Sequence, residues 1–204
     1  SVVTGIKLKE DAEQITFNAS AYLGSAYGYK QIYVSTTDLY ISDTNYIYER
    51  EASYQTMTIS QFSLDKQIAA VTFVAAGTIK GGMLNQFSMD YHDGYLRVAT
   101  TSNGATWRRG NDDWEWVDYE RNVSNHLYVL KLNDAGDGFI IISHLSEGLG
   151  KPLESIKSVR FLDNRAYIVT FLQTDPLYII DLSDPKKPVI TDEIHLPGFD
   201  TYQH

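Results

Sequence analysis

The stretch that decides the fold is IKSVRFLDNRAYIVTFLQTDPLYIIDLSDPKKP, residues 156–188. It holds three short apolar runs, separated by turn residues at Asp163-Asn164, Asp175-Pro176 and Ser183-Asp184-Pro185. Proline fixes φ and favours a turn, and aspartate and asparagine hydrogen-bond to their own backbone at such corners. A fourth run extends from Val189 to Leu196. Four short strands with turn residues between them predict an antiparallel meander of the size of a propeller blade.

The pattern recurs along the chain, which predicts an all-β fold made of about three four-stranded antiparallel β-propeller blades. The expected blades cover approximately residues 15–79, 83–145 and 156–196, and the first two carry insertions between their second and third strands. Periods of this length with four strands each indicate propeller blades. Strand 2–9 and residues 199–204 are assigned to neighbouring blades. A β-sandwich is the alternative, because short alternating strands occur in both folds.

Two further stretches carry local predictions. Asp93-Gly94 predicts a tight hairpin, because glycine adopts a positive φ at no steric cost. Residues 43–55 are polar and rich in tyrosine, and we interpret them as a hairpin or a long loop.

The expected blade count predicts an incomplete ring. Propellers typically close with four to eight blades, so three blades leave open edges with unpaired backbone groups. We therefore expect these 204 residues to be part of a longer propeller. We also expect the open blade edges to pair in a homo-oligomer.

Composition excludes several classes of partner. The formal net charge of −9 argues against nucleic acid, because phosphate binding needs clustered lysine and arginine. The sequence lacks an apolar run long enough for a transmembrane helix. It also lacks cysteine, which removes disulfides, thiolate metal sites and cysteine nucleophiles, and no nucleotide-binding motif is found. We expect no cofactor.

Three blocks of sequence resemble a known family: residues 85–101, residues 159–185 and residues 196–204. They are similar to the β-propeller domain at the C-terminus of secreted bacterial and archaeal proteins, a distant relative of WD40 repeats. The resemblance covers roughly residues 27–204. It implies a propeller fold and an extracytoplasmic location, secreted, periplasmic or surface-anchored, with a signal upstream. The family brings no established activity, so it implies no catalytic residue.

The three tryptophans fall within ten residues, on an insertion between strands, and they lie beside arginines and acids. Tryptophan and arginine are enriched in binding hot spots. Trp107, Arg108, Trp114 and Trp116 are therefore our candidates for binding a ligand or partner. In the alternative interpretation, the tryptophan rings fold back over a blade face as a small local core.

Arg97 and Arg160 lie inside apolar strands. Buried arginine is uncommon unless it is paired. Each is therefore expected to form a structural ion pair or to line the central channel of the propeller.

Histidine and acidic residues give no clear catalytic or metal motif. The sequence places the five histidines in separate blades, without a ligand spacing such as HExxH. Residues 133–138 faintly resemble a calcium loop, but an EF-hand needs a glutamate where His144 stands, so we expect a hairpin turn. We assign no catalytic residue and no metal ligand.

The function that the sequence favours is non-catalytic: an extracytoplasmic propeller that binds a protein or glycan, or acts as a scaffold. The alternative is an extracellular hydrolase or metal-dependent enzyme with its site in the central channel. Convergent inward-facing carboxylates or histidines would distinguish the enzyme from the binding module.

Overall fold

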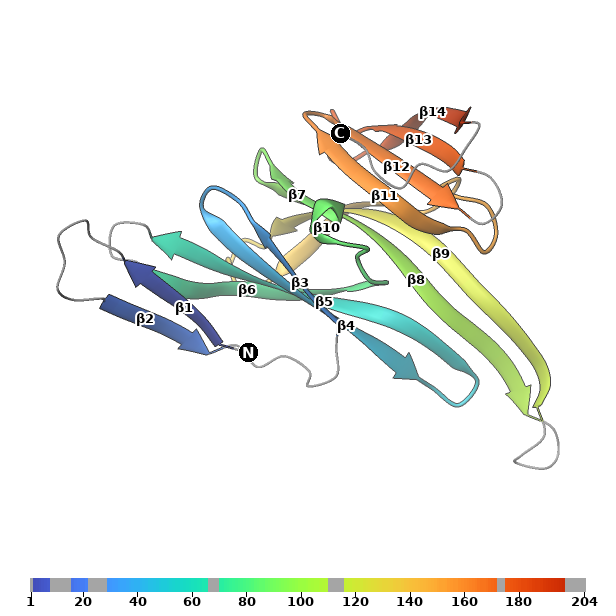
Figure 1. Cartoon of the computed structure of the whole chain (residues 1–204), viewed down its shortest axis with the longest axis horizontal. Helices are drawn as coiled ribbons and strands as arrows, with labels where there is room; N and C mark the ends of the chain where they lie inside the picture. Colours follow the sequence, from blue (N-terminus) through green and yellow to red (C-terminus); the bar gives the residue numbers. More distant parts are fainter. Residues whose placement is uncertain are drawn as a thin grey trace.

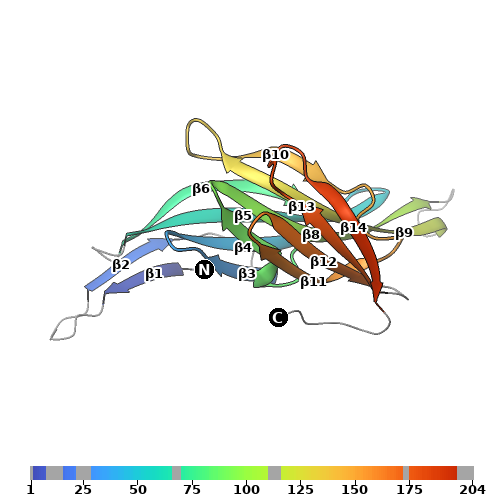
Figure 2. The same ribbon diagram turned by 90° about the horizontal axis from the view of Figure 1, so that it is seen from above.

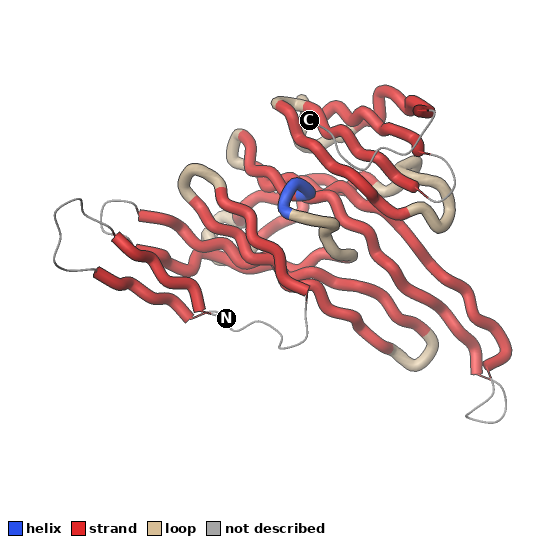
Figure 3. Tube along the Cα trace, in the orientation of Figure 1, coloured by secondary structure: helices blue, strands red, loops and turns tan. Residues whose placement is uncertain are grey.

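The computed structural model describes residues 2–7, 16–21, 29–65, 70–109, 116–171 and 175–196. Antiparallel strands make up most of this part of the chain, and the one helical element in it is the single 3-10 turn η1 (Gln86–Ser88) (Figure 3). The all-β prediction is confirmed.

The strands form three four-stranded meanders, which we call the first, second and third units. The first unit contains β3 (Tyr29–Val34), β4 (Asp38–Tyr48), β5 (Ala52–Asp65) and β6 (Ala70–Lys80). The second contains β7 (Met89–His92), β8 (Tyr95–Arg109), β9 (Trp116–Leu132) and β10 (Phe139–Leu145). The third contains β11 (Ser155–Leu162), β12 (Arg165–Phe171), β13 (Asp175–Asp181) and β14 (Val189–Leu196).

The first unit differs in detail from the sequence interpretation. The first blade is expected to begin near residue 15, but β2 (Thr16–Ala21) pairs with β1 (Val2–Lys7), and the first unit begins at Tyr29. A turn separates β3 from β4 at Ser35, whose Oγ accepts a hydrogen bond from the Asp38 N–H at 2.9 Å.

The first two units share one sheet. The start of β5 pairs with the end of β8, which joins the two meanders into eight strands, whereas the third unit forms its own four-stranded sheet. The polar residues 43–55 form much of the long β4–β5 hairpin that makes this connection possible. Figures 1 and 2 show the three units arranged as a fan, with the second in the middle.

Face-to-face packing builds two main cores, one on each side of the second unit. Alternate residues of β8 point to opposite faces, as in any strand. Leu96 and Val98 pack into the core shared with the first unit, and Ala99 packs into the core shared with the third. This stacking of sheet faces positions the grooves and side-chain clusters described next.

Candidate functional site

A groove with a volume of about 1300 Å³ follows the junction of the first and second units. Its walls come from the start of β5, the end of β6 and the outer halves of β8 and β9, and residues of β10 and the loop after it line it as well. The outer halves of β8 and β9 form a long hairpin that projects beyond the rest of the second unit (Figure 1).

Close backbone contact between β5 and β8 forms one end of the groove. Ser53 pairs with Ala105, and the Trp107 backbone N–H donates to the Glu51 carbonyl at 3.0 Å. A Cβ on Gly104 would lie 2.3 Å from the Ser53 carbonyl oxygen. Only a residue without a side chain fits there, so Gly104 is what allows the two hairpins to meet.

Aromatic rings and neutral polar groups line the groove together with aliphatic side chains such as Ile79, Val123 and Ile141. Tyr54, Tyr119 and Tyr128 contribute rings, and Tyr119 is 66% exposed. Hydroxyl and amide side chains lie between them: Ser53, Thr56, Thr78, Ser102, Thr106, Asn122 and Ser124. The charged residues are of both signs: Lys80, Glu120 and Arg121. Such a surface suits a neutral ligand with many hydroxyl groups better than a strongly charged one.

Three side chains at the floor of the groove form a continuous hydrogen-bonded series. Ser124 Oγ lies 2.9 Å from His126 Nε2, and His126 Nδ1 lies 2.9 Å from His144 Nε2. The His144 ring stacks on Tyr128 at 4.3 Å between centroids and an interplanar angle of 4°. Ser124 and His144 line the groove, whereas His126 behind them is 5% exposed.

The surroundings keep both imidazole rings neutral. Burial first, then the neighbouring His144 ring and the Lys80 ammonium, together lower the pKa of His126 to about 4. Burial and then Lys80 also lower the pKa of His144. Near neutral pH each ring therefore has one N–H donor and one acceptor nitrogen.

Strand periodicity explains how this series forms and why the sequence analysis missed it. Ser124 and His126 are two residues apart on β9, so they lie on one face, and His144 on β10 is registered opposite Tyr128 on that face. The interpretation that the histidines fall in separate blades is wrong: His126 and His144 lie on neighbouring strands of the second unit. The alternation Ser124-x-His126-x-Tyr128 was the available signal.

The structure places two of the tryptophan-segment candidates on β8 and one on β9. Trp107 is partly buried, and its indole N–H donates to the Arg50 carbonyl at 2.9 Å, which ties β8 to the β4–β5 hairpin. Arg108, next to it, is exposed. Trp116 begins β9, and its side chain lies outside the described residues, as does all of Trp114. The indole N–H of Trp107 is therefore already bonded within the chain.

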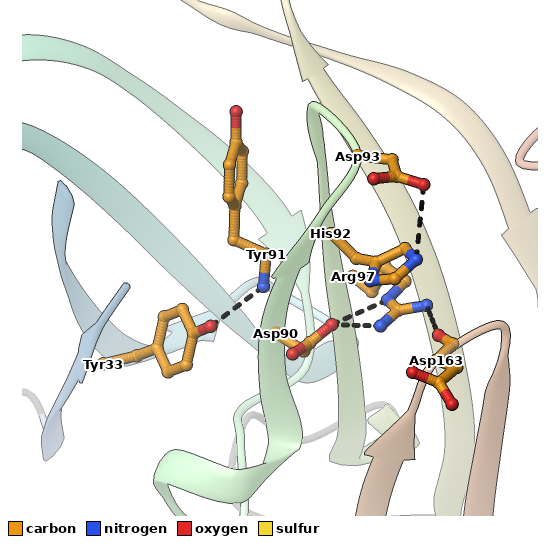
Figure 4. Close-up of polar contacts among 7 residues, drawn as sticks. All are labelled: Tyr33, Asp90, Tyr91, His92, Asp93, Arg97 and Asp163. Atoms are coloured by element: carbon orange, nitrogen blue, oxygen red, sulfur yellow. Dashed lines mark hydrogen bonds and ion pairs between the residues drawn. The ribbon is translucent and has the colours of Figure 1, made fainter. Parts of the chain in front are cut away.

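Arg97 lies where the three units meet (Figure 4). The guanidinium is buried, forms an ion pair with Asp90, and donates to the Asp163 carbonyl of the third unit at 2.5 Å. Nearby, the hydroxyl of Tyr33, from the first unit, accepts a hydrogen bond from the Tyr91 N–H at 3.0 Å. Arg97 thus forms a structural ion pair with Asp90, and its bond to Asp163 holds the β11–β12 turn of the third unit against β8 of the second unit.

Arg160 lies on β11, the first strand of the third unit. Its guanidinium stacks on the Phe87 ring at 3.8 Å from the centroid. It lines a cavity of about 490 Å³ together with Ile32 and Val34 of β3 and Asp90 of β7. The cavity is therefore bordered by the first strand of each unit.

Two absences apply to the described part of the chain. None of its side chains gathers into a group of three or more histidine, aspartate or glutamate residues that could hold a metal ion. None of its helices is long and apolar enough to cross a membrane.

Comparison with known proteins identifies the family. The model of the beta propeller domain family matches residues 1–204. An uncharacterized protein of Methanocaldococcus jannaschii is 36% identical over 162 residues, which are 78% of this chain and 22% of that protein. An uncharacterized protein of Archaeoglobus fulgidus is 36% identical over 146 residues, 72% of this chain and 19% of that protein. No solved structure matches. The chain thus spans about a fifth of the length of these relatives, and it belongs to the beta propeller domain family.

Proposed function

We propose that this propeller is an extracytoplasmic binding module and that the groove between its first and second units takes a glycan. The observation that carries the proposal is the lining of the groove, which combines three tyrosine rings with hydroxyl and amide groups. Sugar rings present flat C–H faces to aromatic rings and hydroxyl groups to neutral donors and acceptors. A tyrosine satisfies both needs, because its ring is apolar and its hydroxyl is polar.

The charges of the groove support a neutral ligand. The chain has a net charge of −9, yet the groove contains Lys80 and Arg121 against Glu120. An acidic or basic peptide would need a field of one sign. A neutral polysaccharide needs none.

The proposed extracytoplasmic location is supported by the sequence and not by the groove. The three sequence blocks resemble a domain of secreted proteins, and a chain without cysteine fits export to a compartment where free thiols are a liability. Glycans of the cell surface would then be within reach of the groove.

Binding to a panel of neutral polysaccharides and to an array of oligosaccharides tests the proposal. We expect at least one glycan to bind, and Tyr119→Ala to weaken its affinity roughly tenfold, as expected for the loss of about 1.4 kcal/mol from one aromatic contact. The matched control is Tyr48→Ala, because Tyr48 is 75% exposed but lies outside the groove.

Three results would contradict the proposal. One is the absence of binding across the panel by a protein with a cooperative unfolding transition. The second is equal loss of affinity in Tyr119→Ala and Tyr48→Ala, which would place the binding surface elsewhere. The third is a protein partner whose binding is not weakened by Tyr119→Ala, which would show that the ligand is a protein and not a glycan.

A further inference from the structure

The series of Ser124, His126 and His144 has the connectivity of an activated nucleophile. A hydroxyl within hydrogen-bonding distance of a histidine, which is itself oriented by a third group, is the arrangement that acyl-transfer enzymes share on unrelated folds. Both links measure 2.9 Å. Neutral rings allow two proton arrangements, and in one of them the Ser124 hydroxyl donates to His126 Nε2 while His126 Nδ1–H donates to His144 Nε2.

We propose that Ser124 is the nucleophile of an ester-hydrolase site in the groove, with His126 as its general base and His144 as the residue that positions His126. This inference goes beyond glycan binding and does not depend on it, because it concerns the serine and not the groove's preferred ligand.

The reaction balances with an ester and water as its reactants. Ser124 Oγ attacks the ester carbonyl carbon as its proton passes to His126 Nε2, and the tetrahedral intermediate expels the alcohol, which takes that proton. Water then attacks the acyl-serine and gives a proton to His126 Nε2. When the acid leaves, Ser124 Oγ recovers the proton, so one ester and one water yield one acid and one alcohol.

Access favours this assignment. Ser124 lines the groove, whereas His126 is almost fully buried behind it. The Lys80 ammonium, from β6, is the charge that acts on both histidines, and on β8 the uncharged Thr100 is registered opposite His126 and Ser102 opposite Ser124.

An ester is the substrate class that asks least of this site, because its carbonyl lacks amide resonance and its alcohol is a better leaving group than an amine. The low pKa of His126, about 4, leaves the ring unprotonated at neutral pH and able to accept the serine proton, although it lies below the working pH that favours general-base catalysis. Acyl groups esterified to the hydroxyl groups of a hydroxylated chain are substrates of this class.

Labelling of the folded protein with a fluorophosphonate, followed by peptide mass spectrometry, tests the nucleophile. We expect the adduct on Ser124, no adduct in Ser124→Ala, and at least about a hundredfold slower labelling in His126→Gln. The control is Ser183→Ala, since Ser183 is an exposed serine whose Oγ bonds to the Asp181 carboxylate at 2.6 Å without any histidine. That variant should label at the wild-type rate.

A pH profile of p-nitrophenyl acetate hydrolysis tests the roles of the two histidines. The wild-type rate should stay level from about pH 7 down to about pH 5 and fall through a limb near pH 4, where His126 takes up a proton. In His144→Asp the carboxylate would stabilise the imidazolium, so the limb should move above pH 5. A purely structural His144 would lower the rate without moving the limb.

Three results would overturn the proposal. They are failure of a folded protein to label at Ser124, labelling that persists at the same rate in His126→Gln, and hydrolysis that is unchanged in Ser124→Ala. Both probes are small and do not need a bound glycan, so these results are independent of glycan binding. Failure of glycan binding would contradict the proposed function alone, and failure of Ser124 labelling would contradict the hydrolase site alone.

Discussion

Gly104 lies directly against the backbone of Ser53: a Cβ on Gly104 would lie 2.3 Å from the Ser53 carbonyl oxygen. Because this oxygen belongs to the backbone of a paired strand, it cannot move aside as a side chain could. We expect Gly104→Ala to lower the free energy of unfolding by about 3 kcal/mol. The control is Gly138→Ala, where the nearest atom is the end of the Asn133 side chain at 3.2 Å and the loss should stay below about 1 kcal/mol. Urea denaturation measures both, and equal losses would contradict the assignment.

Removal of the Arg97 guanidinium should be the most destabilising charge deletion among the sites described here. Arg97→Ala leaves the Asp90 carboxylate and the Asp163 carbonyl without their shared donor, and breaking a buried ion pair costs about 3–5 kcal/mol. Arg97→Lys keeps the charge but loses the fork of donors, so an intermediate loss is expected. Arg160→Ala removes a ring contact and should cost about 1 kcal/mol. A loss in Arg97→Ala no larger than in Arg160→Ala would show that the junction is not held by this pair.

The stability of the protein should fall as the pH is lowered from about 7 towards 4. Folding lowers the pKa of His126 from 6.5 to about 4, so at pH 5 the unfolded chain binds a proton that the folded chain does not. The free energy of unfolding is then fully retained above about pH 7. It should decrease below that by up to about 1.4 kcal/mol per pH unit for this residue.

His126→Gln tests this pH dependence, because glutamine keeps hydrogen-bonding groups and does not titrate. The variant should lose less stability than wild type between pH 7 and pH 5 in urea denaturation. Some loss will remain, since the pKa of His144 is lowered as well. Identical pH dependence in the two proteins would show that His126 titrates normally in the folded state.

The exposed apolar side chains of β3 predict self-association of the isolated chain. Tyr29, Ile32 and Val34 are 63%, 55% and 56% exposed, and within the described structure β3 pairs with β4 alone. An edge with such residues invites pairing with another strand. Multi-angle light scattering at micromolar concentration should find oligomers, and Ile32→Lys should shift them towards monomers.

Tyr48→Lys provides the control for this edge, since Tyr48 is exposed on β4 and lies away from β3's open side. It should leave the oligomer unchanged. A monodisperse wild-type monomer would show that the apolar side chains of β3 do not drive association.

Local signals made much of the fold predictable. Asp93-Gly94 forms the expected hairpin turn with φ values of 48° and 83°, because the sequence of a two-residue turn determines its geometry. The turn at Asp163-Asn164 also connects two strands, β11 and β12, with two residues, but there only Asp163 has a positive φ, of 49°. Alternating apolar residues supplied the strands between these turns.

Contacts between strands distant in sequence were not predictable. The sequence around Ser53 does not predict its pairing with Ala105, and the sequence around Arg97 does not predict its hydrogen bond to a carbonyl 66 residues away. The link between His126 and His144 depends on the register of β9 against β10, which includes a bulge between Ile141 and Ser143. A shift by one residue would turn the histidine to the opposite face.

The continuous sheet of the first two units determines which parts of the protein unfold together. Backbone hydrogen bonds across β5 and β8 join these units, whereas side chains of the second unit hold the third, as in the bond from Ser143 Oγ to the Pro185 carbonyl at 2.6 Å. Native-state hydrogen exchange should therefore reveal two cooperative segments, with the amides of the third unit opening at lower free energy than those of the shared sheet. A ligand held in the groove would then slow exchange in the larger segment and leave the smaller one nearly unaffected.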